Sequence, residues 1–85
     1  MTVKILYFAR LREDVGRSDE EFDLPDGVTN VLELRTCMVS RGGPWAVALG
    51  FGKAVRVSVN HDLARDGTSV KAGDEIAFFP PVTGG

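Results

Sequence analysis

Apolar and polar residues alternate near the start of the chain, which is the pattern of β-strands. Residues 3–9 are rich in β-branched and aromatic types on both faces, which predicts a strand in the middle of a sheet. Residues 19–24 predict a second strand that stops at Pro25-Asp26-Gly27. The polar stretch 12–18 between them contains a glycine, so we expect a turn that closes the two strands into a hairpin.

Two further strands are expected in the second half. Residues 55–59 alternate valine with Arg56 and Ser58, the period of a half-buried strand, before a polar turn at residues 60–62. Residues 75–79 form the last strand, because the two prolines after it cannot donate to a strand ladder. A brief edge strand is predicted at residues 68–70.

One main helix is expected between these pairs of strands. Thr29 can cap its start, because a threonine hydroxyl accepts hydrogen bonds from free backbone N–H groups. Val31, Leu34 and Met38 then recur at helical spacing on one face. Gly42-Gly43-Pro44 is predicted to end the helix.

The order of elements is therefore ββαββ, with residues 45–49 as a short apolar turn or a second helix. We predict an α+β fold in which one main helix covers a mixed sheet. If the first and last strands pair in parallel at the centre, this is the ubiquitin-like β-grasp fold. The domain would take up residues 1–79, and residues 80–85 would be a flexible tail ending in Gly-Gly.

Composition narrows the class of protein. The 85 residues are 44% hydrophobic and 26% charged, values typical of one small globular domain. The net charge of −2 argues against nucleic acid or an anionic membrane as a partner. One cysteine cannot form an internal disulfide, and no long apolar run is present, so we expect a cytoplasmic protein without a targeting segment.

The side chains give weak signals for chemistry. His61 has no second histidine or carboxylate pair at metal spacing, so it is read as a solvated turn residue. Cys37 lies in the predicted helix without a neighbouring base, and Gly50-Phe51-Gly52-Lys53 lacks the rest of a phosphate loop. The acidic run Asp19-Glu20-Glu21 is expected to be a solvated strand start. No metal site, no bound cofactor and no catalytic side chain is predicted.

The C-terminal residues 80–85 are the strongest candidate for chemistry. Two prolines stiffen the start of this tail, and Gly84 and Gly85 allow close approach of a partner's backbone to the terminal carboxylate. A carboxylate is a poor electrophile at neutral pH, so it must be activated, for example by adenylation with ATP. Sulfide could then convert it to a thiocarboxylate, or a lysine could form an isopeptide. The plainer alternative is an inert tail.

Four segments of the chain carry a resemblance to a known family. The clearest is Gly73 to Gly85, GDEIAFFPPVTGG, which resembles the C-terminal signature of the small, sulfur-carrier subunit of molybdopterin synthase. Residues 7–13, 29–34 and 57–60 are similar to the same family in order and type, and the likeness is loosest over residues 41–54.

The resemblance implies that Gly85, with Gly84 beside it, is the reactive end of the chain. A ubiquitin-activating-type adenylyltransferase would use ATP to adenylate Gly85, and sulfur would convert it to a thiocarboxylate. The tail would enter the large catalytic subunit of molybdopterin synthase and donate sulfur to cyclic pyranopterin monophosphate in molybdenum cofactor biosynthesis. The usual assembly is a heterotetramer, and the catalytic side chains would lie on the partner.

A docking surface is expected where the tail leaves the sheet. Phe8 and Phe79 would form an exposed apolar patch there, unless both belong to the core. The residues predicted to bind the partner are Phe8, Arg12, Leu63, Phe79, Pro80, Pro81, Val82 and Thr83. Three other functions stay open: a carrier for another pathway such as thiamine biosynthesis, a ubiquitin-like modifier conjugated to lysines, and a plain interaction module.

Overall fold

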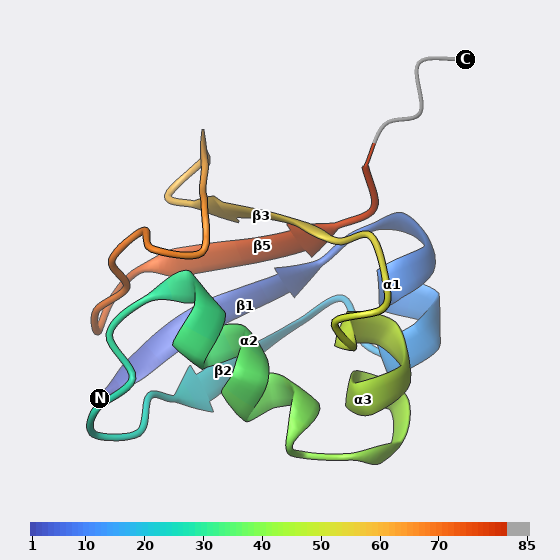
Figure 1. The fold of residues 1–85 in the computed structure, drawn as a ribbon, viewed down its shortest axis with the longest axis horizontal. Helices are drawn as coiled ribbons and strands as arrows, with labels where there is room; N and C mark the ends of the chain where they lie inside the picture. Colours follow the sequence, from blue (N-terminus) through green and yellow to red (C-terminus); the bar gives the residue numbers. More distant parts are fainter. Residues whose placement is uncertain (82–85) are drawn as a thin grey trace.

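The first and last strands, β1 (Thr2–Tyr7) and β5 (Glu75–Phe79), lie side by side and parallel at the centre of the sheet (Figure 1). The structure is a computed structural model and describes residues 1–81. In it β2 (Asp19–Asp23) pairs antiparallel with β1, and β3 (Arg56–Val59) pairs antiparallel with β5. With β4 (Asp62–Leu63) at one edge the order is β2-β1-β5-β3-β4, so the predicted β-grasp fold is confirmed.

The core lies on one face of this sheet. Val3, Ile5 and Tyr7 point into it from β1, and Ile76 and Phe78 do so from β5. Burial of such apolar side chains is the main source of stability in a domain of this size. The buried side chains of all three helices belong to the same cluster, so the helices cover this face (Figure 1).

Helix α2 (Val31–Val39) packs on the sheet with the predicted face, since Val31, Leu34 and Met38 are all buried. Its cap is one residue later than predicted. The Asn30 side chain accepts a hydrogen bond from the Glu33 backbone N–H at 2.8 Å. Thr29 instead donates its own N–H and hydroxyl to the Glu33 carboxylate, so Glu33 is hydrogen-bonded to both residues that precede the helix.

Residues 12–18 are not a simple turn, which corrects the prediction. Helix α1 (Ala9–Val15) occupies most of the connection between β1 and β2. Its charged residues face solvent, whereas Leu11 and Val15, four residues apart, enter the core. Gly16, with φ of 79°, ends the helix in a left-handed conformation that glycine adopts readily.

The residues expected to end α2 instead begin the next helix, α3 (Gly43–Leu49). Pro44 lies in its first turn, where a missing N–H has no intrahelical partner to lose. The predicted strand at 68–70 is also wrong, because Ser69 forms only an isolated bridge with Asn30. Within residues 1–81, no helix is both long and apolar enough to cross a bilayer.

Candidate functional site

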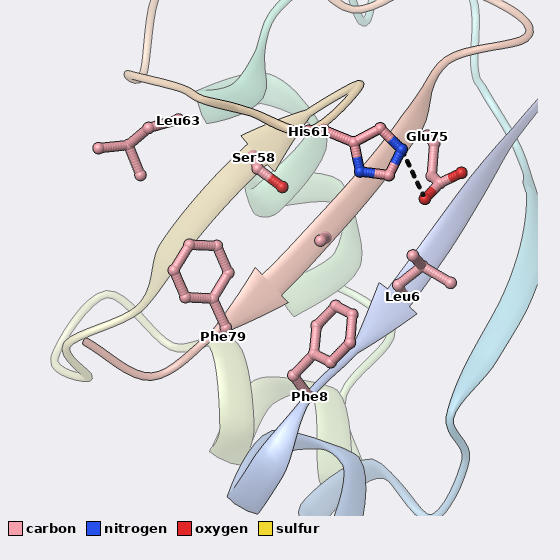
Figure 2. A pocket seen from close by; sticks show the side chains of 8 residues that line it. Leu6, Phe8, Ser58, His61, Leu63, Glu75 and Phe79 are labelled. Atoms are coloured by element: carbon pink, nitrogen blue, oxygen red, sulfur yellow. Dashed lines mark ion pairs between the residues drawn. The ribbon is translucent and has the colours of Figure 1, made fainter. Parts of the chain in front are cut away.

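A shallow apolar groove of about 510 Å³ lies on the face of the sheet opposite the helices (Figure 2). Strands β1, β3, β4 and β5 and the turn between β3 and β4 all contribute to it. The lining residues are Leu6, Phe8, Ser58, His61, Leu63, Glu75, Ala77 and Phe79.

Strand alternation explains why apolar side chains gather on this open face. Leu6 and Phe8 point away from the core because Ile5 and Tyr7 point into it. Leu6 of β1 is opposite Ala77 of β5 in register, so the outward-facing apolar side chains of the two strands lie side by side. Phe8 is 48% exposed and Leu63 on β4 is 66% exposed. Large apolar residues exposed together in this way are typical of a binding surface.

The other end of the groove is polar. The His61 Nε2 atom lies 3.8 Å from the Glu75 carboxylate, so the two form an ion pair only when the imidazole is protonated (Figure 2). Asn60 holds this end in place: its side chain donates to Asp74 and accepts from the Glu75 backbone N–H, each at 3.0 Å. Both Asn60 and His61 have positive φ, at 51° and 74°.

The structure brings together three of the residues predicted to bind a partner, Phe8, Leu63 and Phe79 (Figure 2). Phe8 is exposed and Phe79 half-buried on the open face, so neither belongs to the helix-covered core. Arg12 is exposed on α1 and is not among the groove-lining residues. Pro80 and Pro81 follow β5 and are half-buried. Val82, Thr83, Gly84 and Gly85 lie outside the described residues.

Sequence reasoning missed the polar part of the groove. His61 was expected only as a solvated turn residue, and its side chain is indeed 83% exposed. Glu75 was assigned to the last strand with no further role. The alternation of β5 contains a usable signal, because Glu75, Ala77 and Phe79 must share the face opposite Ile76 and Phe78.

The acidic run 19–21 is not uniformly solvated, which corrects another prediction. The Glu20 side chain is only 8% exposed and accepts hydrogen bonds from Tyr7 and Arg41. Burial on its own would raise the pKa of Glu20. The hydrogen bonds from Arg41 and Tyr7, with the charges of Arg41 and Arg17, outweigh it and lower the pKa.

The loop after α3 is a turn, as predicted, and a side chain from α2 organises it. The Arg35 guanidinium donates hydrogen bonds to the carbonyls of Leu49, Gly50 and Lys53. It also lies 4.7 Å from the centre of the Phe51 ring, a cation–π distance. Arg35 therefore holds the loop in shape through hydrogen bonds to three of its backbone carbonyls.

The profile of the ThiS family matches residues 5–85, which is nearly the whole chain. The chain belongs to the ThiS family. Two curated relatives of this ThiS-family chain are both named molybdopterin synthase sulfur carrier subunit. The Haemophilus influenzae protein is 41% identical over 83 residues, covering 98% of this chain and 99% of the relative. The Escherichia coli protein is 42% identical over 85 residues, with the same coverage.

A solved structure agrees with the fold of this ThiS-family chain. The small archaeal modifier protein 1 of Haloferax volcanii superposes with a TM-score of 0.75 at 28% identity, covering 95% of this chain and 98% of that one. The β-grasp architecture is thus shared with a protein whose name denotes a modifier.

Proposed function

We propose that this chain is the sulfur-carrier subunit of a molybdopterin synthase. The observation that carries the proposal is the identity of 41% and 42%, over nearly full length, to two proteins with that name. The chain also ends in Gly-Gly six residues after the last strand, which suits delivery of a terminal group into a narrow site.

Activation would occur at the carboxylate of Gly85. A carboxylate oxygen attacks the α-phosphorus of ATP in the activating enzyme, the bond to the bridging oxygen breaks, and pyrophosphate leaves. Hydrosulfide then attacks the acyl carbon, the carbon–oxygen bond breaks, AMP leaves, and a thiocarboxylate remains. Adenylation is needed because AMP is a far better leaving group than oxide from a free carboxylate.

Transfer would occur inside the large catalytic subunit. The thiocarboxylate sulfur forms a new bond to an oxygen-bearing carbon of cyclic pyranopterin monophosphate, the carbon–oxygen bond at that carbon breaks, and the oxygen leaves as water. Water attacks the acyl carbon, the acyl carbon–sulfur bond breaks, and Gly85 returns as a carboxylate. The catalytic side chains for this step belong to the large subunit in our proposal, and this chain supplies the sulfur.

The groove gives the large subunit a place to dock. Phe79, the last residue of β5, lines the groove and is followed directly by Pro80 and the tail. A partner that covers Phe8, Leu63 and Phe79 is therefore placed next to the point where the tail begins. Docking at a rigid sheet would fix the origin of the tail and so reduce the loss of entropy when it enters the active site.

The test is the intact mass of the chain after incubation with ATP, the adenylyltransferase and sulfide. We expect one oxygen to be replaced by sulfur at Gly85, and we expect the purified product to support molybdopterin formation with the large subunit. The same mass change without ATP, or a thiocarboxylated chain that the large subunit cannot use, would contradict the proposal.

A second candidate function is conjugation to lysines. It is favoured by the similarity to the archaeal protein named as a modifier. Here a lysine amine attacks the Gly85 adenylate, AMP leaves and an isopeptide bond forms. Covalent adducts of higher mass that depend on ATP and Gly85 would support this use. A carrier for thiamine biosynthesis would instead form the thiocarboxylate but not support molybdopterin formation.

A further inference from the structure

A charged cluster lies on the helix-covered side of the sheet, where α1 and α3 contact each other (Figure 1). Arg17 follows α1 and Arg41 precedes α3, and each donates from its Nη1 atom to the Glu20 carboxylate. Arg17 contacts Oε1 at 3.4 Å and Arg41 contacts Oε2 at 3.0 Å, so one carboxylate holds two guanidinium groups. Strand alternation turns the neighbouring Asp19 and Glu21 to the opposite face of β2.

Aromatic rings hold both arginines in place. The Arg41 Cζ atom lies 3.9 Å from the centre of the Trp45 ring and 5.4 Å from the centre of the Phe22 ring. The Arg17 Cζ atom lies 5.5 Å from the centre of the Trp45 ring. All three are cation–π distances. These contacts restrict the two side chains before any ligand arrives, so less rotamer entropy is lost when one binds.

The cluster has more positive than negative charge. Two arginines and one glutamate leave one positive charge uncompensated, because the hydrogen bonds from Arg41 and Tyr7 lower the pKa of Glu20 despite its burial and keep it ionised at neutral pH. Within residues 1–81, no other carboxylate lies within ion-pair distance of either arginine. Even Glu13 and Asp14, about one turn earlier on α1, are exposed and form no such pair.

Most of the hydrogen-bond donors of the two arginines have no partner in the described part of the chain. A guanidinium has five N–H groups, yet in each arginine only Nη1 donates to another residue. The Arg17 side chain is 47% exposed and that of Arg41 is 27% exposed, so solvent reaches both. A guanidinium is weakly hydrated, and its planar fork matches the two oxygens of a carboxylate.

We propose that Arg17 and Arg41 together form a carboxylate site that binds an aspartate or glutamate side chain of another protein. One added carboxylate balances the excess charge of the cluster, whereas a phosphate dianion exceeds it and is repelled by Glu20. The net charge of the chain is −2, so attraction of an acidic partner depends on these two arginines. Since the site and the apolar groove lie on opposite sides of the sheet, the inference is independent of docking at the groove.

The test uses a Gly-Glu-Gly peptide, acetylated and amidated so that it has one carboxylate, with the Gly-Gln-Gly peptide as its matched control. Each is titrated into the full chain at pH 7 and constant ionic strength, and inorganic phosphate is titrated separately. The readout is the emission of Trp45, the single tryptophan, whose ring both arginines contact. The variants are Arg17→Gln and Arg41→Lys. Arg65→Gln is the control, since it removes one positive charge at an exposed loop position.

We expect a saturable change in emission with the glutamate peptide, none with the glutamine peptide, and weaker binding of phosphate. Arg17→Gln should weaken binding of the glutamate peptide about two- to fivefold, the range for an exposed ion pair. Arg41→Lys should weaken it by a similar factor, because lysine keeps the charge but lacks the planar fork. Arg65→Gln should bind like wild type.

Three results would overturn the inference: equal responses to the two peptides, tighter binding of phosphate than of the glutamate peptide, or equal losses in Arg17→Gln and Arg65→Gln. Arg17→Gln removes only a 3.4 Å contact of an exposed side chain, so the variant should fold, and far-UV circular dichroism checks this. Thiocarboxylate formation at Gly85 is measured by mass and does not involve this site, so the proposed function and this inference can fail separately.

Discussion

The Tyr7 hydroxyl donates a 2.6 Å hydrogen bond to the Glu20 carboxylate, linking β1 to β2 beneath the helices. Two groups from the region of α3 join the same pair. Trp45 Nε1 donates to the Tyr7 hydroxyl, and Arg41 donates to Glu20, each at 3.0 Å. Arg41 also lies 3.9 Å from the Trp45 ring centre. This network connects the sheet to α3 through polar groups that satisfy one another, and buried networks of this kind are costly to break.

The first prediction concerns alkaline pH. Burial, with the hydrogen bond to Glu20, raises the pKa of Tyr7 well above its ordinary value. Tyr7 therefore contributes stability that is complete below about pH 10, the pKa of an unfolded tyrosine, and is lost as the pH rises further. Tyr7 is the only tyrosine, so tyrosinate absorbance should rise only together with loss of far-UV circular dichroism. A tyrosinate signal from a still-folded chain near pH 10 would contradict this.

The second prediction concerns acid. Because the folded-state pKa of Glu20 is lowered, its carboxylate stabilises the fold above the unfolded pKa of about 4.3, and this contribution is lost as the pH falls further. Glu20→Gln should lower the free energy of unfolding by about 1–2 kcal/mol at pH 7, measured in urea. The difference from wild type should shrink below about pH 4.

The control for this experiment is Glu13→Gln, which makes the same chemical change at an exposed site on α1. It should alter the free energy of unfolding by less than about 0.5 kcal/mol. If the two variants were equally stable at pH 7, the Glu20 network would contribute nothing measurable.

The third prediction compares substitution by glycine at two adjacent residues, His61 and Asn60. His61→Gly should raise the free energy of unfolding by up to about 1 kcal/mol, because φ of 74° suits glycine. Asn60→Gly relieves similar strain but removes hydrogen bonds to Asp74 and Glu75, so it should lower that free energy by about 1 kcal/mol. If urea unfolding showed that both variants change the free energy of unfolding in the same direction, the hydrogen bonds of Asn60 would not determine the effect of Asn60→Gly.

The fourth prediction tests the groove as a docking surface. Phe79→Asp places a charge among apolar lining residues, so affinity for the large subunit should fall at least about tenfold while far-UV circular dichroism is unchanged. The matched control is Phe51→Asp, since Phe51 is 54% exposed and lies outside the groove. It should bind like wild type. A collapse in melting temperature for Phe79→Asp would instead assign Phe79 to the core.

The fifth prediction concerns the last two residues. Gly84→Val, or deletion of Gly85, should leave stability and docking near wild type, because the core lies between Val3 and Phe78. Sulfur transfer should be abolished, since displacing a reacting group by about 1 Å can cost on the order of 100-fold in rate. The readout is molybdopterin formation by purified components. Molybdopterin formation with the truncated chain would contradict the proposed role of Gly85.

Sequence patterns were sufficient where periodicity is local. Residue types in 3–9, alternation in 55–59 and the prolines after 75–79 predicted three strands, and the spacing of Leu34 and Met38 predicted the inner face of α2. These patterns work because each residue's side is fixed by its immediate neighbours.

Other features depend on partners far away in the chain. Glu20 looks solvated in its own segment, but its carboxylate accepts hydrogen bonds from Tyr7, 13 residues earlier, and from Arg41, 21 residues later. Helix α1 was missed because its charged residues outnumber Leu11 and Val15, the pair whose spacing contains the helical signal. The groove combines residues from four strands, so its polar end could be recognised only once the pairing of β3 with β5 was known.

The position of β5 also bears on how the protein is made. Its residues 75–79 fill the middle of the sheet, between β1 and β3. Until the ribosome has added them, no strand pairs with both β1 and β3. One hydrogen-bonding edge of β1 then has no partner. Contacts between segments so far apart in sequence form slowly compared with local ones. Synthesis must therefore pass Phe79 before the sheet can close, so the groove and the start of the tail come into being in the same late step.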